Sequence, residues 1–135
     1  MEQSQRLVAR EDALDLAVEA VMLRRPKTFP TNATVGEARR LFLNESIRAA
    51  LLVDGSTFVA MVVRADLPDT AADGEPVLAY GNRDAARARP GTLVRDAMQL
   101  IEGASENRLV VAGEDDTFHG LVCLRRSVDA FLVDE

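Results

Sequence analysis

The chain has 135 residues, of which 47% are hydrophobic and 28% charged; this is the composition of a globular protein and excludes a fibrous or disordered class. Sixteen basic against 22 acidic residues give a formal net charge of −6 at pH 7, which disfavours binding to the phosphates of nucleic acids. No apolar run is long enough to span a bilayer and the first residues lack a secretory pattern, so we expect a cytoplasmic protein without membrane contact.

Two residue types that carry much of enzyme chemistry are nearly absent. Cys123 is the only cysteine and His119 the only histidine, which excludes an intrachain disulfide, a Cys-x-x-Cys motif and a multi-histidine zinc site. No nucleophile–base pair can be assembled from these two residues, and no phosphate-cradling loop is present. We therefore expect no enzyme, no metal and no required cofactor. Cys123 lies between apolar neighbours and is expected to be a core residue.

Helical periodicity appears three times along the chain. In Glu11–Met22 the apolar residues recur on one side, which predicts an N-terminal helix that packs on the rest of the protein. A second helix is expected near 34–44, where Thr34 and Glu37 have the spacing of a capping box. A third is expected near 93–103, with Thr92 as its cap.

Two β-hairpins follow the second and third helices. Residues 49–53 and 58–63 flank a short polar turn that contains glycine, and residues 109–112 and 117–124 repeat the arrangement. Between the two halves, the segment 68–76 holds two prolines, a glycine and three acids, which predicts a loop.

The chain therefore contains an internal repeat. Val35 and its helix correspond to Val94 and its helix, 59 residues later, whereas Thr57 and its strand correspond to Thr117, 60 residues later. We expect the extra residue to lie between helix and strand. Each copy, of roughly 60 residues, reads as helix, strand, turn and strand.

These repeated strings resemble the CBS-domain family, named after cystathionine beta-synthase, over about residues 17–133. Their order, which appears twice at one spacing, is that of a tandem CBS pair, also called a Bateman module. In the first copy the strings are Val21-Met22-x-Arg24-x-Pro26-x-Thr28, Ala33-Thr34-Val35-x-Glu37-Ala38, Arg48-x-x-Leu51-Leu52-Val53-Asp54-Gly55 and Asp66-Leu67. In the second they are Arg89-Pro90-Gly91-Thr92-x-Val94-x-Asp96-Ala97, Arg108-Leu109-Val110-Val111 and Gly120-Leu121-Val122-Cys123-Leu124.

The resemblance implies an α/β fold in a single compact module. Each copy would have a small three-stranded sheet backed by two helices, and the copies would pack sheet against sheet about a pseudo-twofold axis. The implied organisation is an N-terminal extension or helix over 1–16, a first repeat with its linker over 17–76 and a second repeat over 77–135. Such pairs commonly form homodimers through their helices, which we also expect here.

The resemblance further implies an adenosine ligand, such as AMP, ADP, ATP or S-adenosylmethionine, in a cleft between the copies. The family's signature has a glycine, then a Ser or Thr, then an Asp or Asn that holds the ribose hydroxyls. In the first copy Asp66 matches the ribose position, whereas Val63 lacks the hydroxyl. In the second copy Gly120 matches, whereas Arg126 stands at the ribose position and inverts the charge.

The resemblance therefore implies a nucleotide site in the first copy, and a different role for the cleft of the second copy. Arg125 and Arg126 favour a bare anion there, or no ligand. Asp66 has an alternative interpretation as the N-cap of a helix. The candidate ligand residues are Lys27, Thr28, Val63, Arg64, Asp66, Gly120, Arg125 and Arg126.

Two functional classes remain open. The first is a regulatory module that senses an adenine nucleotide or a related adenosyl ligand. The alternative is a ligand-free module for dimerisation or protein interaction, whose protein partner the sequence does not identify.

Overall fold

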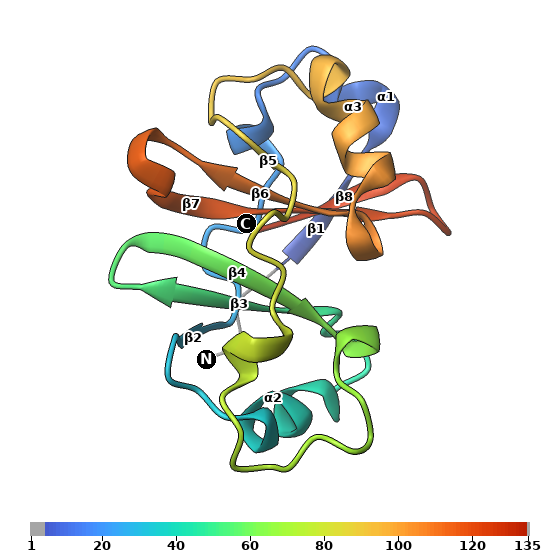
Figure 1. Ribbon diagram of the computed structural model, residues 1–135. Helices are drawn as coiled ribbons and strands as arrows, with labels where there is room; N and C mark the ends of the chain where they lie inside the picture. The colour runs from blue at the N-terminus through green and yellow to red at the C-terminus, as the bar shows by residue number, and fades with distance from the viewer. Residues whose placement is uncertain (1–4, 135) are drawn as a thin grey trace. The chain divides into compact units, whose positions relative to one another are not determined.

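The computed structural model describes residues 5–134 and divides the chain into two compact units (Figure 1). Unit 1 combines the chain up to Pro26 with the chain from Ala86 on, and unit 2 is Lys27–Ala85. Each unit has its own sheet and its own hydrophobic core on one face of that sheet. The α/β class is confirmed.

Unit 2 is built on a three-stranded sheet in the order β2-β3-β4. β2 runs parallel to β3, and β3 and β4 form an antiparallel hairpin. The helix α2 and the apolar residues Ala50, Leu52, Ala60 and Val62 share the core of this unit. The elements are β2 (Thr28–Pro30), α2 (Val35–Phe42), β3 (Ala49–Asp54), β4 (Thr57–Val63) and the 3-10 helices η2 (Arg64–Asp66) and η3 (Val77–Tyr80).

Unit 1 has, among the described residues, a five-stranded sheet in the order β1-β8-β7-β6-β5. The helix α3 and the inward residues Leu109, Val111, Val122 and Leu124 belong to its core. The elements are β1 (Gln5–Ala9), α1 (Arg10–Ala13), η1 (Val18–Ala20), β5 (Arg87–Ala88), α3 (Val94–Gly103), η4 (Ser105–Asn107), β6 (Arg108–Ala112), η5 (Glu114–Asp116), β7 (Phe118–Arg125) and β8 (Ala130–Asp134).

Both expected hairpins and the helices near 34–44 and 93–103 are confirmed, and 68–76 is a loop. The prediction of a three-stranded sheet in the second copy is wrong, because β1 and β8 add two antiparallel strands. Each unit also has fewer regular helices than expected, since its second helical position is occupied by the short 3-10 helices η1 and η3.

The predicted helix over Glu11–Met22 is also wrong. Only the last three residues of α1 and the three of η1 are helical there. The backbone instead bonds to distant segments: the N–H of Val18 donates to the carbonyl of Thr92 at 2.8 Å, and Leu16 accepts from Val94 at 2.8 Å. The apolar periodicity predicted which side chains are buried, but not the secondary structure. Backbone hydrogen bonds to distant segments form here in place of the i→i−4 bonds of a helix.

The segment that begins each repeat packs on the other repeat. Residues 17–24, at the start of the first repeat, pair with the second through the bridges Ala17–Leu93 and Leu23–Leu121. Residues 76–83, where the second repeat begins, pair with the first through the bridges Thr34–Pro76 and Met61–Asn82. The compact units therefore cut across the sequence ranges 17–76 and 77–135, because the two copies exchange these segments.

Strand register corrects the position of the extra residue. Thr28 pairs with Leu51 and Arg87 with Val110, so the first two strands of the copies are both offset by 59. Their hairpin partners β4 and β7 are offset by 60. The extra residue is therefore in the hairpin and not between helix and strand.

The two long helices begin with different caps. At α2 the Thr34 hydroxyl accepts from the N–H of Glu37 and the Glu37 carboxylate accepts from the N–H of Thr34, both at 3.2 Å. The prediction that Thr92 caps α3 is wrong: its N-cap is Leu93, which makes no side-chain bond. The carbonyls of Leu14 and Leu16 accept from the first N–H groups of α3 instead.

This difference predicts unequal effects of two threonine substitutions. Thr34→Ala should lower the free energy of unfolding by about 1 kcal/mol, because the N–H of Glu37 loses its acceptor. Thr92→Ala is the matched control and should change stability by less than about 0.5 kcal/mol. Urea denaturation of both variants measures the difference; equal losses would contradict the assignment of the caps.

Candidate functional site

The predicted site residues of unit 2 gather at one end and one face of its sheet. Thr28 pairs with Leu51 and Leu51 with Met61, so these three side chains share a face, and Val63 lies on the same face two residues beyond Met61. It is the face opposite the core of unit 2. Thr28 and Val63 are on the two outer strands of the sheet, with β3 between them.

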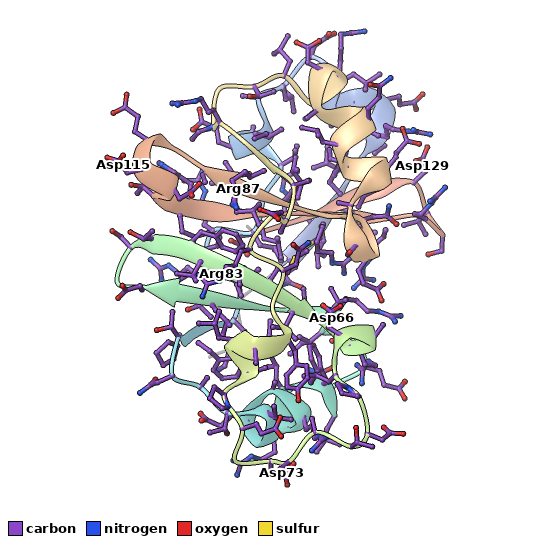
Figure 2. All side chains as sticks on the ribbon, viewed as in Figure 1. Asp66, Asp73, Arg83, Arg87, Asp115 and Asp129 are labelled. Atoms are coloured by element: carbon purple, nitrogen blue, oxygen red, sulfur yellow. The ribbon has the colours of Figure 1, made fainter. Side chains whose placement is uncertain are left out.

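Asp66 lies in η2, directly after β4 (Figure 2). One carboxylate oxygen, Oδ2, accepts from the backbone N–H of Val63 at 2.9 Å, and the residue is exposed. The prediction of Asp66 as an N-cap is therefore wrong in detail, because the carboxylate caps η2 by reaching back from its third residue. The carboxylate can accept further hydrogen bonds, since an ionised carboxylate has about four acceptor sites.

Arg64 points away from the face of Thr28 and Val63. Its Nη1 donates to the carbonyl oxygen of Phe42 at 2.5 Å, and its guanidinium lies 5.2 Å from the centre of the Phe42 ring. A second, longer bond of 3.4 Å reaches the carbonyl of Ile47. The cation therefore stabilises the carboxyl end of α2, where the helix dipole favours positive charge. Lys27 is exposed beside β2 and is the basic residue closest in sequence to Thr28.

The space beside the α-carbon of Gly120 is filled by another segment of the protein. A Cβ at this position would lie 2.6 Å from both the sulfur of Met22 and the carbonyl oxygen of Leu23. The Leu23–Leu121 bridge places that segment against β7. The structural reason for this glycine is therefore the close crossing of the exchanged segment, which fills the space over the Cα of Gly120.

The corresponding crossing in unit 2 is as close. A Cβ on Gly81 would lie 2.9 Å from the Cβ of Ala60, and the Met61–Asn82 bridge is the counterpart of Leu23–Leu121. Here the glycine is on the exchanged segment and the alanine on the strand. Small residues thus lie where the segment crosses the strand: Gly120 in unit 1, and Ala60 with Gly81 in unit 2.

Cys123 is buried, as expected. Loss of solvation in the protein interior raises the pKa of its thiol from 9.0 to about 11, although Arg108 and Arg125 partly oppose the shift. The thiol is therefore protonated at neutral pH and is a poor nucleophile. His119 is exposed on β7.

Arg125 and Arg126 lie where β7 ends, and only Arg125 belongs to the strand. Sequence reasoning missed the structural neighbours of Arg125. Arg108 pairs with Cys123, two residues before Arg125, so Arg108 and Arg125 point from the same face of the unit 1 sheet. The missed signal was the 59-residue offset, which aligns Arg108 with Ala49 and Arg87 with Thr28.

Other features of the described chain bear on the class of site. No group of three or more His, Cys, Asp or Glu residues within 5–134 could hold a metal ion. Nor does any helix in that range have the length and apolar character needed to cross a membrane. Two surface hollows lie away from the predicted ligand residues. They are lined by Ala9, Arg10, Glu11, Leu14, Val128 and Asp129, and by Thr34, Gly36, Arg39, Arg40, Leu43, Asp73 and Gly74.

Comparison with solved structures defines the class of protein. The fold is similar to a putative acetoin utilization protein (AcuB) from Vibrio cholerae, at 22% identity and a TM-score of 0.70, over 80% of this chain and 84% of the other. It is also similar to the CBS-pair protein CBSX2 from Arabidopsis thaliana, at 20% identity and a TM-score of 0.70, over 79% and 87% of the two chains. CBSX2 in complex with AMP matches at 21% identity and a TM-score of 0.69, over 84% and 92%. The fold is that of a CBS pair.

Residues 18–69 match the model of the CBS domain family, and this range covers most of the first repeat. These residues are therefore assigned to the CBS domain family. No curated protein matches it.

The close crossing at Gly120 predicts a steric cost. Gly120→Ala should lower the free energy of unfolding by about 1–3 kcal/mol, because the new methyl group meets a backbone carbonyl that cannot move freely. Gly103→Ala is the matched control: nothing lies within 4 Å of its Cβ position, and stability should be unchanged or slightly higher. Thermal and urea denaturation of both variants would contradict this explanation if Gly120→Ala were as stable as the control.

Proposed function

We propose that the protein is a regulatory, non-catalytic CBS-pair module that senses an adenosine compound through unit 2. The observation that carries the proposal is the exposed carboxylate of Asp66 directly after β4. It stands at the position that the family's signature gives to the ribose ligand. The likeness to a CBS-pair protein in complex with AMP supports the ligand class, although it shows only the fold of this chain.

The surroundings of Asp66 favour a ligand with few phosphates. Arg64 is committed to the carbonyl of Phe42, so it does not supply charge to the face of Thr28. Lys27, exposed and next to Thr28 in the sequence, is the candidate partner for a phosphate, and one ammonium group compensates the charge of one phosphate better than that of three. Among the candidates AMP, ADP, ATP and S-adenosylmethionine, the site therefore fits AMP or S-adenosylmethionine best, and no ligand is required as a cofactor.

The test uses three aspartate variants and calorimetry with AMP and S-adenosylmethionine. Asp66→Ala should weaken binding at least about tenfold, since a hydrogen bond to a charged group contributes about 1.5–3 kcal/mol. It should also lower stability by about 1 kcal/mol, because the N–H of Val63 loses its acceptor.

Asp66→Asn separates the two roles of this side chain. The amide oxygen can still accept from the N–H of Val63, so the melting temperature should change little. Only one acceptor oxygen remains and the charge is gone, so affinity should still fall. Asp69→Ala, at an exposed aspartate in the following loop, is the control and should leave affinity unchanged.

The alternative is a ligand-free module for dimerisation or protein interaction. If the wild type binds neither compound at millimolar concentration, the sensing function is wrong and the interaction function replaces it. Affinity that is equal in the wild type and in Asp66→Asn would instead show that binding does not use this carboxylate.

We also propose that the protein is a homodimer. Large apolar side chains are exposed on or beside both long helices: Leu43 is 81% exposed, Leu93 40% and Leu100 45%. A second copy would remove these side chains from water. Size-exclusion chromatography with light scattering should give twice the mass of one chain; a monomer at tens of micromolar would contradict this proposal.

A further inference from the structure

Three of the four strands at the ends of the two sheets are short or covered. β5 has two residues and is followed at once by Arg89 and Pro90. β2 has three residues and ends at Pro30, which has no N–H to donate. β4 is bonded on its outer side, where Met61 exchanges two backbone hydrogen bonds with Asn82. Short strands, prolines and covering segments are common means of preventing a sheet edge from pairing with another chain.

The fourth end strand, β1, is longer and contains no proline. It has five residues, and β8 is its only strand partner within residues 5–134. Gln5, Arg6 and Leu7 are exposed. An edge strand of this kind presents a row of backbone donors and acceptors to another strand. We call the side of β1 that faces away from β8 its free edge.

The hydrogen bonds to β8 show which groups of β1 point to the free edge. In an antiparallel pair, residues alternate between those that exchange bonds with the partner strand and those that point away from it. The N–H of Arg10 donates to the carbonyl of Asp129 at 3.0 Å, and this pair continues the register in which Ala9 is opposite Ala130. The even-numbered residues of β1 therefore bond to β8. The odd-numbered residues direct their N–H and C=O groups to the free edge.

The neighbouring strands give the same result independently. Leu121 of β7 exchanges backbone hydrogen bonds of 2.8 and 3.0 Å with Leu23, so its N–H and C=O point away from β6 and to the side of β8. Alternation along β7 and across the Cys123–Leu132 pair then leaves the odd-numbered residues of β8 to bond β1. Those residues are opposite the even-numbered residues of β1.

The side chain of Leu7 is available together with its backbone. It is 47% exposed, and it is opposite the half-buried Leu132, which is in turn opposite Cys123. These three side chains form an apolar row on the face of the sheet that is opposite the core of unit 1. Leu7 is the end of that row at the free edge.

β1 is complementary to itself in the antiparallel direction. If Leu7 is opposite Leu7 of a second copy, the outward groups of Gln5 meet those of Ala9, and each such pair can exchange two hydrogen bonds. Arg6 is then opposite Val8, so no like charges face each other. A two-fold axis through the pair of leucines closes the assembly as a dimer, whereas a head-to-tail contact would form a filament.

We propose that the free edge of β1 is the surface through which two copies of this chain pair, with Leu7 on the two-fold axis and one sheet continuous across both copies. The inference rests on the proposed homodimer and names its interface. The second copy supplies the backbone partners that the free edge lacks within residues 5–134 and removes Leu7 from water. It does not depend on the binding of an adenosine compound at Asp66.

The test places opposite charges at position 7 of the full chain. Leu7→Lys and Leu7→Glu each put like charges face to face, so each variant alone should raise the dissociation constant of the dimer at least about tenfold. An equimolar mixture of the two variants should form a heterodimer, because a cation then faces a carboxylate. Light scattering gives the mass, and native mass spectrometry distinguishes the heterodimer. Far-UV circular dichroism and the melting temperature check that the variants are folded.

Leu100→Lys is the matched control. It places the same charge at a leucine of α3 that is 45% exposed, close to the exposure of Leu7. It should weaken the dimer much less than Leu7→Lys, because α3 has no row of backbone groups that needs a partner strand. Weakening by Leu100→Lys that equals or exceeds that by Leu7→Lys would place the interface on the helices and overturn the assignment to β1.

Amide exchange measured by NMR tests the alternation along β1. The N–H groups of Leu7 and Ala9 should exchange more slowly at concentrations where the dimer forms than at concentrations where it dissociates. The N–H of Val8 is the internal control, since it bonds to β8 in either state, and its exchange should change much less. Equal exchange of the Leu7 amide at both concentrations would contradict the proposed pairing.

The remaining outcomes separate this inference from the homodimer itself. A wild type that is monomeric at tens of micromolar overturns the homodimer and its interface together. A dimeric wild type whose Leu7→Lys and Leu7→Glu variants also remain dimers overturns only the assignment to β1. If both variants are monomers and their mixture forms no heterodimer, Leu7 is not opposite Leu7 and the proposed register is wrong.

Discussion

The close crossing of an exchanged segment over the second strand of a hairpin is the constraint on which both units depend. At each crossing two backbone hydrogen bonds join segment and strand: Leu23 with Leu121 in unit 1, and Met61 with Asn82 in unit 2. Segment and strand also meet where a Cβ would project, so a side chain there must be missing or very small. Gly120 satisfies the condition in unit 1, whereas Ala60 and Gly81 satisfy it together in unit 2.

The residues just before these segments organise the starts of the helices. The carbonyls of Leu14 and Leu16 accept from the first turn of α3, and those of Asp73 and Glu75 accept from the first turn of α2. A helix start leaves several N–H groups without partners, and here an adjoining backbone supplies the acceptors. Thus α3 needs no side-chain cap. Either repeat alone would lack its crossing segment, and the second would also lack the acceptors of α3, which is a physical reason for the two copies to occur together.

The two copies share a backbone plan but differ in charge at equivalent places. The turn after β4 presents a carboxylate, Asp66, whereas the residue 60 positions later is Arg126. The β2 position of Thr28 corresponds to Arg87, and the β3 position of Ala49 to Arg108. Hydroxyl groups of a sugar require acceptors, and phosphate groups require donors. The adenosine site is therefore proposed in unit 2, where the carboxylate is.

The sequence by itself determined the repeat, the two long helices, both hairpins, the buried state of Cys123 and the family. These depend on periodicity, on turn residues and on the Thr34–Glu37 capping box, all of which act within a few residues of the chain. Only the tertiary structure decided the partners of 17–24 and 76–83, the true reason for Gly120 and the commitment of Arg64 to α2. It also decided that Arg108 and Arg125, which are 17 positions apart in the chain, lie on the same face of the sheet. The physical reason is that hydrogen bonds between distant backbones and the register of a sheet leave no local pattern in the residues that make them.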